Sequence, residues 1–401
     1  MPLVCEQVHL PTRSLMIVMM ICHYDDTNSI GGLEKQARLL SRALRSSGHD
    51  VVVLASTRKL FRARWTDDDG IPVRYFWTYT TPQVSGRHLP AALLWAIQLL
   101  FWVFLNRSRI SLLHCHQIRI QAFVAAIAAK LWKIPSILKS AVGGTGADIG
   151  AIGSRKYFGP AGRRFIIRNT DTFIAITATI RHDLLSYGVP DNRIRIVPNG
   201  IEFKQPRKTG AAPEVRARRG IFLGRLAPDK NPLQLAIAAV DVARADGFQV
   251  DFYGRGCFQA KLEATLRMAG NPAVAYKGWV TDPGSVLRNY GYVLLPSSAE
   301  GLSNAMIEAM ANGVVPIAAK ISGFVDHIVH GHNGFFFEGI DHSSLVHGLE
   351  MIAAISTDRW CAISSSAQDY AKSRFDLSAV CSEYLALYAG LASARRTVIR
   401  I

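Results

Sequence analysis

The chain has 401 residues, of which 49% are hydrophobic and 19% are charged. This length exceeds what one hydrophobic core usually reaches, so we expect two globular domains and exclude a largely disordered chain. The net charge of +16 is concentrated in the first half, where residues 1–200 hold 25 Lys and Arg against 12 Asp and Glu (+13). Residues 201–401 hold 21 against 18 (+3). The basic half predicts contact with an anionic surface such as a cytoplasmic membrane leaflet.

Nucleic acid is the competing anionic partner for this basic half. The chain has no zinc-finger spacing, no aromatic-basic RNA-binding motif and no long basic helix, so we predict no nucleic-acid binding. Its six cysteines are scattered without a C-x-x-C pair, and the first apolar run lacks a cleavage site for a signal peptide. These features are typical of a reducing compartment. We therefore expect a cytoplasmic protein that binds peripherally at the inner face of the cell membrane.

The first half of the chain alternates between strand and helix patterns. An apolar run at 15–22 is followed by a Gly-rich turn, a helical apolar pattern at 34–46 and a second apolar run at 50–54. The alternation continues with strands expected at 110–116, 136–138, 172–176 and 194–197. Strands that alternate with helices predict a doubly wound α/β domain with a parallel sheet.

One segment of this half has membrane-like composition. Residues 89–105 form a run of 17 residues without a charge, with Gln98 in the middle. A spanning helix needs about 20 apolar residues. We therefore favour a buried or interfacial helix, while a true membrane span stays open as the alternative.

A segment rich in basic residues, Pro and Gly separates two α/β patterns. We predict a first domain at 1–203, a linker at 204–220 and a second α/β domain at 221–380, followed by a helix and tail at 381–401 that returns to the first domain. The segment between 364 and 391 is predicted to be helical.

Two glutamates eight residues apart form the strongest chemical motif. Glu300 and Glu308 follow a predicted strand at 292–295, in a segment that we expect to open a helix. Eight helical residues span about 12 Å, comparable to the reach from the ribose to the sugar of a nucleotide sugar. The N–H groups at 301–303 would then form an anion site at the helix start. Two surface glutamates near a helix end are the alternative.

Two cations lie on the loop after the first strand of the second domain. Arg225 and Lys230 belong to the segment Gly224 to Asn231. A guanidinium and an ammonium on one loop suit a diphosphate whose charge grows as a glycosidic bond breaks. Ordinary surface cations in a basic protein remain the alternative.

With these motifs in order, the sequence resembles the retaining glycosyltransferases of family four, which have the two-lobed GT-B fold, from about Leu15 to Tyr388. The segments that carry the resemblance are 31–34, 197–201, 224–231 and 300–308. It implies two Rossmann-like doubly wound parallel-sheet domains that face each other across a cleft. It also implies a nucleotide-sugar substrate, a UDP- or GDP-sugar, and no bound cofactor.

The resemblance also implies roles for single residues. Arg225 and Lys230 would bind the phosphates, Glu308 the ribose hydroxyls and Glu300 the donor sugar. His116, at the end of a predicted strand, would face the sugar or acceptor, with a packed strand histidine as the alternative. The remaining donor-binding residues that it implies are Gly31, Gly32, Gly301, Leu302, Ser303 and Val280.

A metal site is not expected. His114 and His116 lack further ligands at the usual zinc spacing. The run Asp67 to Asp69 looks like the DxD motif of metal-dependent transferases, but between Trp65 and Gly70 we expect it in a solvated loop. We therefore predict no essential metal.

The function predicted from these features is transfer of a hexosyl group, with retention, from the donor to a hydroxyl of a lipid-linked or growing glycan. The pathway would be synthesis of a surface polysaccharide or lipopolysaccharide. Two alternatives use other chemistry: a nucleotide-sugar epimerase or phosphorylase on the same fold, or a non-catalytic membrane-associated binding protein.

Overall fold

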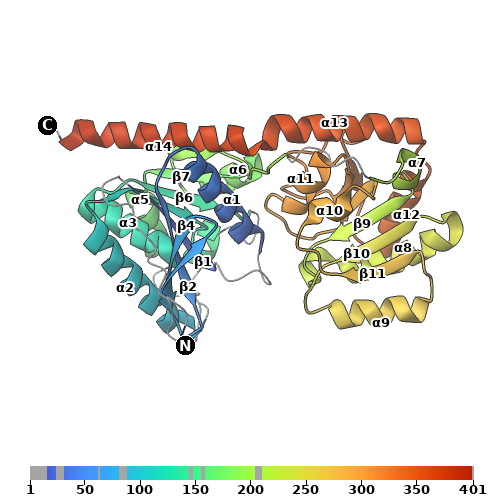
Figure 1. Ribbon diagram of the computed structural model, residues 1–401, viewed down its shortest axis with the longest axis horizontal. Helices are drawn as coiled ribbons and strands as arrows, with labels where there is room; N and C mark the ends of the chain where they lie inside the picture. The colour runs from blue at the N-terminus through green and yellow to red at the C-terminus, as the bar shows by residue number, and fades with distance from the viewer. Residues whose placement is uncertain are drawn as a thin grey trace. The chain divides into compact units, whose positions relative to one another are not determined.

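The computed structural model describes residues 16–23, 31–61, 64–80, 88–143, 148–154, 159–203 and 210–399. Within it the chain forms two compact units, Met1–Gly200 with Leu377–Ile401, and Ile201–Asp376 (Figure 1). The chain crosses between them twice, at Gly200/Ile201 and at Asp376/Leu377.

The first unit is built on an eight-stranded sheet in the order β3-β4-β2-β1-β5-β6-β7-β8. All neighbouring strands are parallel except the hairpin of β3 and β4. The strands are β1 (Met16–His23), β2 (Val51–Thr57), β3 (Trp65–Asp68), β4 (Ile71–Trp77), β5 (Ile110–His116), β6 (Ser136–Ser140), β7 (Thr172–Ala175) and β8 (Ile194–Ile196). The helices are α1 (Gly32–Ser46), α2 (Leu89–Asn106), α3 (Ile120–Trp132), α4 (Asp148–Gly153), α5 (Gly159–Asn169), α6 (Ala178–Ser186) and α14 (Leu377–Ile399), with a 3-10 turn η3 (Asp191–Arg193).

Helices cover both faces of this sheet, which explains why β2 is buried along its whole length. Helices α1 and α14 pack over one face, where Leu40, Leu44 and Tyr384 join the strand residues in one core. Helices α2, α3 and α5 lie side by side on the other face (Figure 1).

The second unit holds a six-stranded parallel sheet in the order β11-β10-β9-β12-β13-β14. Its strands are β9 (Arg219–Leu223), β10 (Gln249–Tyr253), β11 (Val274–Gly278), β12 (Tyr292–Leu295), β13 (Val315–Ala319) and β14 (Phe335–Phe337). Its helices are α7 (Pro213–Arg216), α8 (Pro232–Asp246), α9 (Gln259–Ala269), α10 (Pro283–Leu287), α11 (Asn304–Ala311), α12 (His342–Ala353) and α13 (Thr357–Phe375), with a 3-10 turn η4 (Pro228–Lys230).

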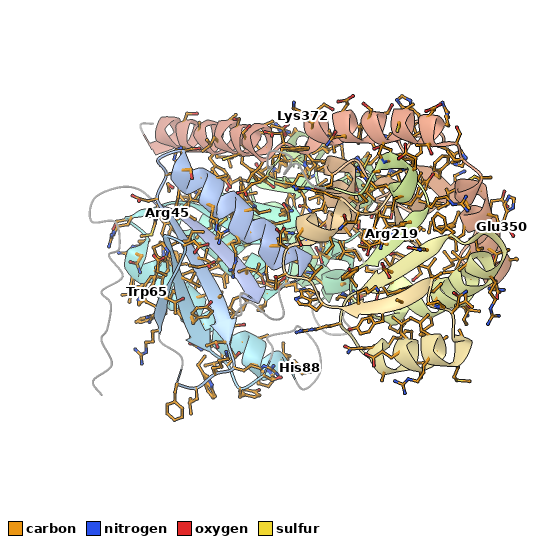
Figure 2. All side chains as sticks on the ribbon, turned by 45° about the vertical axis from the view of Figure 1, so that its right-hand side comes forward. Arg45, Trp65, His88, Arg219, Glu350 and Lys372 are labelled. Carbon is orange, nitrogen blue, oxygen red and sulfur yellow. The ribbon has the colours of Figure 1, made fainter. Side chains whose placement is uncertain are left out.

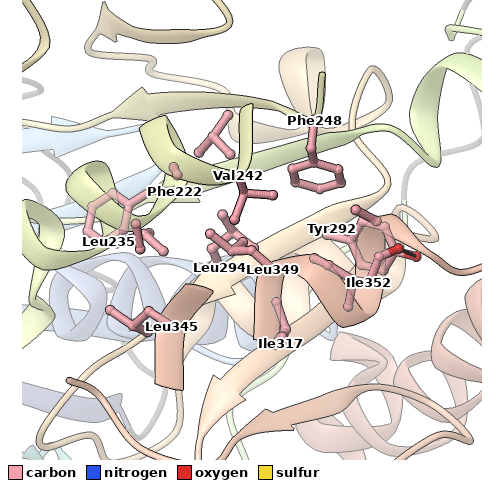
Figure 3. Packing of buried hydrophobic residues seen from close by; sticks show 14 of the residues in the cluster. Phe222, Leu235, Val242, Phe248, Tyr292, Leu294, Ile317, Leu345, Leu349 and Ile352 are labelled. Atoms are coloured by element: carbon pink, nitrogen blue, oxygen red, sulfur yellow. Dashed lines mark hydrogen bonds between the residues drawn. The ribbon is translucent and has the colours of Figure 1, made fainter. Parts of the chain in front are cut away.

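The core of the second unit packs strand side chains against α8 and α12. Phe222, Phe248 and Tyr292 from the sheet region meet Leu235 and Leu349 from the two helices (Figure 3). Each fully buried side chain of this size contributes about 1.5–3 kcal/mol through removal from water. This core holds the sheet edge that carries the candidate donor residues.

The helical structure expected between 364 and 391 is present as two helices, since α13 ends before Asp376 and α14 begins at Leu377. The loop expected at Asp67 to Asp69 is wrong for Asp67 and Asp68, which end strand β3, whereas Asp69 lies in the following turn. Trp65 anchors that strand by packing against Trp102, with ring centroids 6.4 Å apart.

Among the described residues, one helix, α2, is long and apolar enough to cross a membrane by length and composition, and 33% of its span is buried inside the protein.

Candidate active site

The loops that carry the candidate donor residues gather at one edge of the second sheet. Strand β9 lies between β10 and β12, and the strand order runs outward from this point in both directions. The loops after β9, β10, β11 and β12 all leave the carboxyl edge, because the strands are parallel. In open α/β sheets, ligands bind outside this edge where the strand order reverses.

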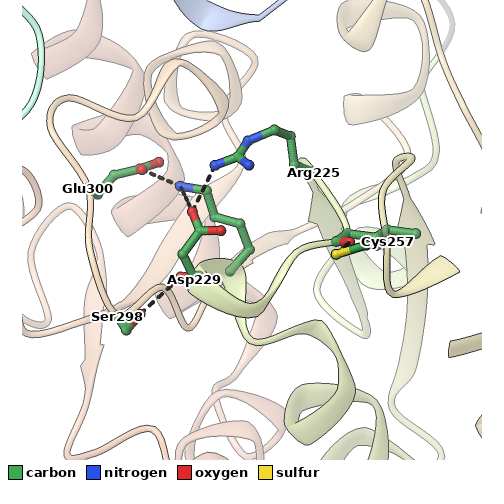
Figure 4. Close-up of polar contacts among 7 residues, drawn as sticks. Arg225, Asp229, Cys257, Ser298 and Glu300 are labelled. Carbon is green, nitrogen blue, oxygen red and sulfur yellow. Dashed lines mark hydrogen bonds and ion pairs between the residues drawn. The ribbon is translucent and has the colours of Figure 1, made fainter. Parts of the chain in front are cut away.

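The two cations after β9 are both paired with carboxylates (Figure 4). The ammonium of Lys230 forms an ion pair with Glu300, which follows β12, and lies 3.9 Å from the carboxylate of Asp229. The guanidinium of Arg225 donates to Asp229 over 2.8 Å and is mostly exposed. The Lys230–Glu300 pair therefore bridges the two loops on either side of the point where the strand order reverses.

Backbone contacts hold these two loops together. The N–H of Ser298 donates to the carbonyl of Asp229 over 2.9 Å. Asn231 adopts a left-handed conformation with φ 53°, which Asn tolerates well, and its side chain donates to the carbonyl of Ile340 over 3.0 Å. The loop that presents Lys230 is thus fixed from both sides.

Close backbone approaches at this edge require glycine. At Gly254, after β10, a Cβ atom would lie 1.8 Å from the carbonyl oxygen of Gly224. At Gly323, after β13, φ is +88° and a Cβ atom would lie 1.6 Å from the carbonyl oxygen of Gly301. Only glycine permits such contacts. The backbone at Gly301 is therefore packed directly against the loop after β13.

The prediction that Glu300 and Glu308 lie on one helix is wrong. Helix α11 begins at Asn304, and Ser303 is its N-cap, accepting a hydrogen bond from the N–H of Met306 over 3.4 Å. Glu300 and Gly301 lie in the preceding loop. The spacing of about 12 Å expected from helical rise therefore does not apply, and the amino-terminal dipole of α11 lies after Ser303.

The other candidate donor residues of this unit are distributed as follows. Leu302 and Ser303 are buried, Glu308 lies half-buried on α11, and Val280 lies half-buried in the loop after β11. All four therefore belong to elements at or next to the carboxyl edge of the sheet.

Two candidate residues of the first unit lie at the start of α1. Gly31 is its N-cap and Gly32 is its first residue. Neither has a positive φ among the described backbone angles. A Cβ atom on Gly31 would lie 2.5 Å from a carboxylate oxygen of Glu34, and burial raises the pKa of Glu34 above its ordinary value. The atom nearest to that Cβ position is the end of the half-buried Glu34 side chain, at the start of the helix.

His116 ends β5 inside a buried polar cluster. Its ring stacks on His114, with centroids 4.5 Å apart, and His114 shares a 2.8 Å hydrogen bond with the hydroxyl of Tyr388 on α14. Within the described part of the chain neither ring nitrogen of His116 has a hydrogen-bond partner. Burial holds the pKa of His116 well below its ordinary value, so its ring is neutral and free of charge repulsion with Lys139 on the adjacent strand.

Sequence reasoning missed two residues that contact the candidates. Asp229 pairs with Arg225, and its only sequence signal was an acidic residue four positions after an arginine. Lys139 is itself buried on β6, and this burial lowers its pKa to about 7. The sequence signal for Lys139 was a lysine near the carboxyl end of a predicted strand.

The acidic run at 67–69 has structural partners. Asp68 pairs with Arg38 over 3.0 Å, Asp69 pairs with Arg42, and a carboxylate oxygen of Asp67 accepts from the N–H of Gly70 over 2.6 Å. Among the described residues no group of three or more His, Cys, Asp or Glu side chains is arranged to hold a metal ion.

Models of two known domain families match the two units of this chain. A glycosyl transferase 4-like domain matches residues 31–200, and a domain of the glycosyl transferases group 1 family matches residues 217–354. The two models together match well over half of the chain. The chain belongs to the group 1 glycosyltransferases.

Two of the curated proteins that are similar to this chain come from Staphylococcus aureus and Escherichia coli. The capsular polysaccharide biosynthesis glycosyltransferase CapM of Staphylococcus aureus is 25% identical over 195 residues, which is 45% of this chain and 51% of CapM. The UDP-Gal:alpha-D-GlcNAc-diphosphoundecaprenol alpha-1,3-galactosyltransferase of Escherichia coli is 27% identical over 171 residues, 39% of this chain and 44% of that protein. The chain thus matches about half the length of these relatives.

Solved structures show the fold of this group 1 glycosyltransferase. The Anabaena protein HepE, crystallised with UDP and glucose, matches with a TM-score of 0.70 at 17% identity, covering 94% of this chain and 99% of HepE. The two α/β units with parallel sheets are those of the GT-B fold.

Proposed function

We propose that this protein is a retaining glycosyltransferase that transfers a hexosyl group from a UDP-sugar to a hydroxyl of a lipid-linked or growing glycan. The observation that carries the proposal is the Lys230–Glu300 ion pair. It brings a cation and a carboxylate from two separate loops to the point where ligands of open α/β sheets bind.

The donor diphosphate is assigned to the cations after β9 and to the start of α11. Arg225 contributes a mostly exposed guanidinium, and Lys230 contributes an ammonium held by Glu300. The amino-terminal dipole of α11 adds favourable interaction with negative charge. These three groups stabilise the charge that grows on the diphosphate as it leaves.

The rest of the donor follows from this placement. Glu308, on α11, is assigned to the ribose hydroxyls, and Val280 to the base. Glu300 is assigned to the sugar, with the backbone of Gly301, Leu302 and Ser303 beside it. Gly31 and Gly32, at the start of α1, are assigned to the phosphate as positions where the backbone carries no side chain.

We propose that the glycosidic bond forms on the same face from which the diphosphate leaves. The bond from the anomeric carbon to the phosphate oxygen breaks, the acceptor oxygen bonds to that carbon, and its proton passes to the departing phosphate. A double displacement needs two carboxyl groups about 5 Å apart, one of them a free nucleophile. Glu300 is instead paired with Lys230. His116, neutral because of burial, is assigned to the sugar or acceptor.

The names of similar proteins support a UDP-sugar ahead of a GDP-sugar. HepE was crystallised with UDP and with UDP-glucose, and the Escherichia coli relative is named for UDP-Gal. The same relative acts on a diphosphoundecaprenol acceptor, and CapM is named for capsular polysaccharide biosynthesis. We therefore propose a role in surface polysaccharide or lipopolysaccharide synthesis, at the inner face of the cell membrane.

Thermal-shift measurements with UDP-, GDP- and ADP-sugars test the donor site. A ligand at 100 times its dissociation constant adds about 2.7 kcal/mol of stability. We expect UDP-sugars to raise the melting temperature of the wild type and of Arg267→Ala, an exposed arginine on α9. Arg225→Ala and Glu308→Ala should lose most of that shift. Equal shifts in all four proteins would refute the assigned site.

Product analysis tests the reaction itself. Incubation with a UDP-sugar and an undecaprenyl-diphosphate sugar should give a new glycoside whose anomeric configuration, read by NMR coupling constants, matches the donor. An inverted product would refute the same-face reaction. Conversion of the UDP-sugar into an isomer without acceptor would identify an epimerase instead.

A further inference from the structure

Helix α2 exposes a continuous row of large apolar side chains. Leu89, Leu93, Ile97, Phe101 and Leu105 recur every four residues and therefore lie along one face of the helix. Their exposed fractions are 40%, 49%, 65%, 62% and 59%. We name these five residues the α2 outer row. Single exposed apolar residues are ordinary, but a contiguous row of this length marks an interaction surface.

The opposite face of α2 is packed into the first unit. Trp95, Leu99 and Val103 are fully buried, and the side chain of Gln98 donates to the carbonyl of Trp77 over 3.1 Å. His88, labelled in Figure 2, precedes the helix and shares a 3.0 Å hydrogen bond with Thr80. A helix fixed along one face to its own domain does not span a bilayer, so the outer row is available only to a partner that lies alongside it.

Aromatic and aliphatic neighbours widen this surface. Phe104 is 40% exposed and packs against Trp132 at the end of α3, with ring centroids 5.5 Å apart. Leu131 beside it is exposed, and so is Trp77, whose carbonyl contacts the middle of α2. Tryptophan is enriched at membrane–water interfaces, where an apolar ring and a polar edge are both satisfied.

A basic group borders the carboxyl end of the same surface. The guanidinium of Arg107 lies 4.4 Å from the ring centroid of Phe104, and Lys130 and Lys133 flank Leu131 and Trp132 with exposed side chains. Helices α2 and α3 contain no acidic residue. An apolar row with Arg107, Lys130 and Lys133 at its carboxyl end is complementary to a surface with an apolar interior and anionic head groups.

We infer that the outer row of α2, together with Leu131, Trp132 and the basic group at Arg107, Lys130 and Lys133, binds this protein to an anionic lipid surface, with α2 parallel to the membrane plane. The inference rests on the lipid-linked acceptor of the proposed function. A second copy of the chain is the alternative occupant of this surface, and the measurement of oligomeric state below separates it from lipid.

Vesicle co-sedimentation tests the surface directly. The variant Leu93→Gln, Ile97→Gln, Phe101→Gln removes three exposed side chains of the outer row. The matched control Ile237→Gln, Met268→Gln, Val329→Gln changes three exposed apolar residues of the second unit. With phosphatidylglycerol vesicles we expect the wild type and the control to bind alike and the α2 variant to bind at least tenfold more weakly. Unchanged thermal melting would show that both variants are folded.

The charge contribution has its own measurement. Arg107→Gln with Lys133→Gln should weaken binding to phosphatidylglycerol vesicles by about fivefold per cation removed, and added salt should weaken wild-type binding. Equal binding of the wild type to phosphatidylcholine vesicles would overturn the anionic assignment. If the α2 variant bound phosphatidylglycerol vesicles as tightly as the wild type, or if the wild type did not bind them, the assignment of this surface to lipid would be overturned.

Light scattering separates the alternative partner. A wild-type dimer that becomes monomeric in the α2 variant would assign the surface to a second copy and overturn the lipid proposal. The vesicle experiment tests the lipid surface and the thermal-shift experiment tests the donor site, so either proposal can fail without the other. A protein that binds vesicles but shows no thermal shift with any nucleotide sugar would keep the lipid surface and lose the proposed function.

Discussion

The ion pair between Lys230 and Glu300 makes the most direct test of the candidate site. Their side chains are 14% and 18% exposed. Exposed pairs contribute about 0–1 kcal/mol, whereas loss of one partner of a buried pair costs about 3–5 kcal/mol. For this largely buried pair we expect Lys230→Met or Glu300→Gln alone to cost about 2 kcal/mol, because each leaves the other group without its partner.

A double-mutant cycle measures the coupling. For a unit of this size we expect each single variant to lower the melting temperature by about 4–8 °C, and the double variant to fall by little more than either single one. Differential scanning calorimetry of the four proteins gives the coupling energy, expected at about 1–2 kcal/mol. The exposed pair Arg181–Asp191 is the matched control, with an expected coupling below about 0.5 kcal/mol. Additive effects of Lys230→Met and Glu300→Gln would refute the pair.

Three further outcomes follow from the packing. Gly323 and Gly331 have similar positive φ values, +88° and +76°, but only at Gly323 would a Cβ atom meet backbone. In urea unfolding, Gly331→Ala should therefore lower the unfolding free energy by about 1–2 kcal/mol, and Gly323→Ala should lower it by clearly more. Tyr388→Phe removes a buried 2.8 Å hydrogen bond and should cost about 1–2 kcal/mol, while Tyr79→Phe, at an exposed tyrosine, should cost almost nothing in the same assay. Burial lowers the pKa of Lys139 to about 7, so above that pH the unfolded chain binds more protons than the folded chain. The unfolding free energy, measured at pH 7, 8 and 9, should therefore rise by up to about 1.4 kcal/mol per pH unit. The variant Lys139→Met should flatten this rise. A wild-type unfolding free energy that stays constant from pH 7 to 9 would contradict the lowered pKa of Lys139.

Local patterns were enough to predict the fold and the order of the site segments. Continuous apolar runs such as 50–54 predict strands buried on both faces, and their alternation with helices predicts two parallel sheets, because these signals depend on residues close in sequence. The motif at Glu300 and the motif at Arg225 and Lys230 were recognised in the same way.

Tertiary structure decided which of these residues touch. Lys230 and Glu300 are 70 positions apart, and they pair because β9 and β12 are neighbours in the second sheet. Residue spacing suggested one helix for Glu300 and Glu308, but the serine cap at Ser303 starts the helix after Glu300. Which face of α2 is exposed also follows from packing, since its composition is apolar all round and helical periodicity in the sequence does not distinguish the two faces.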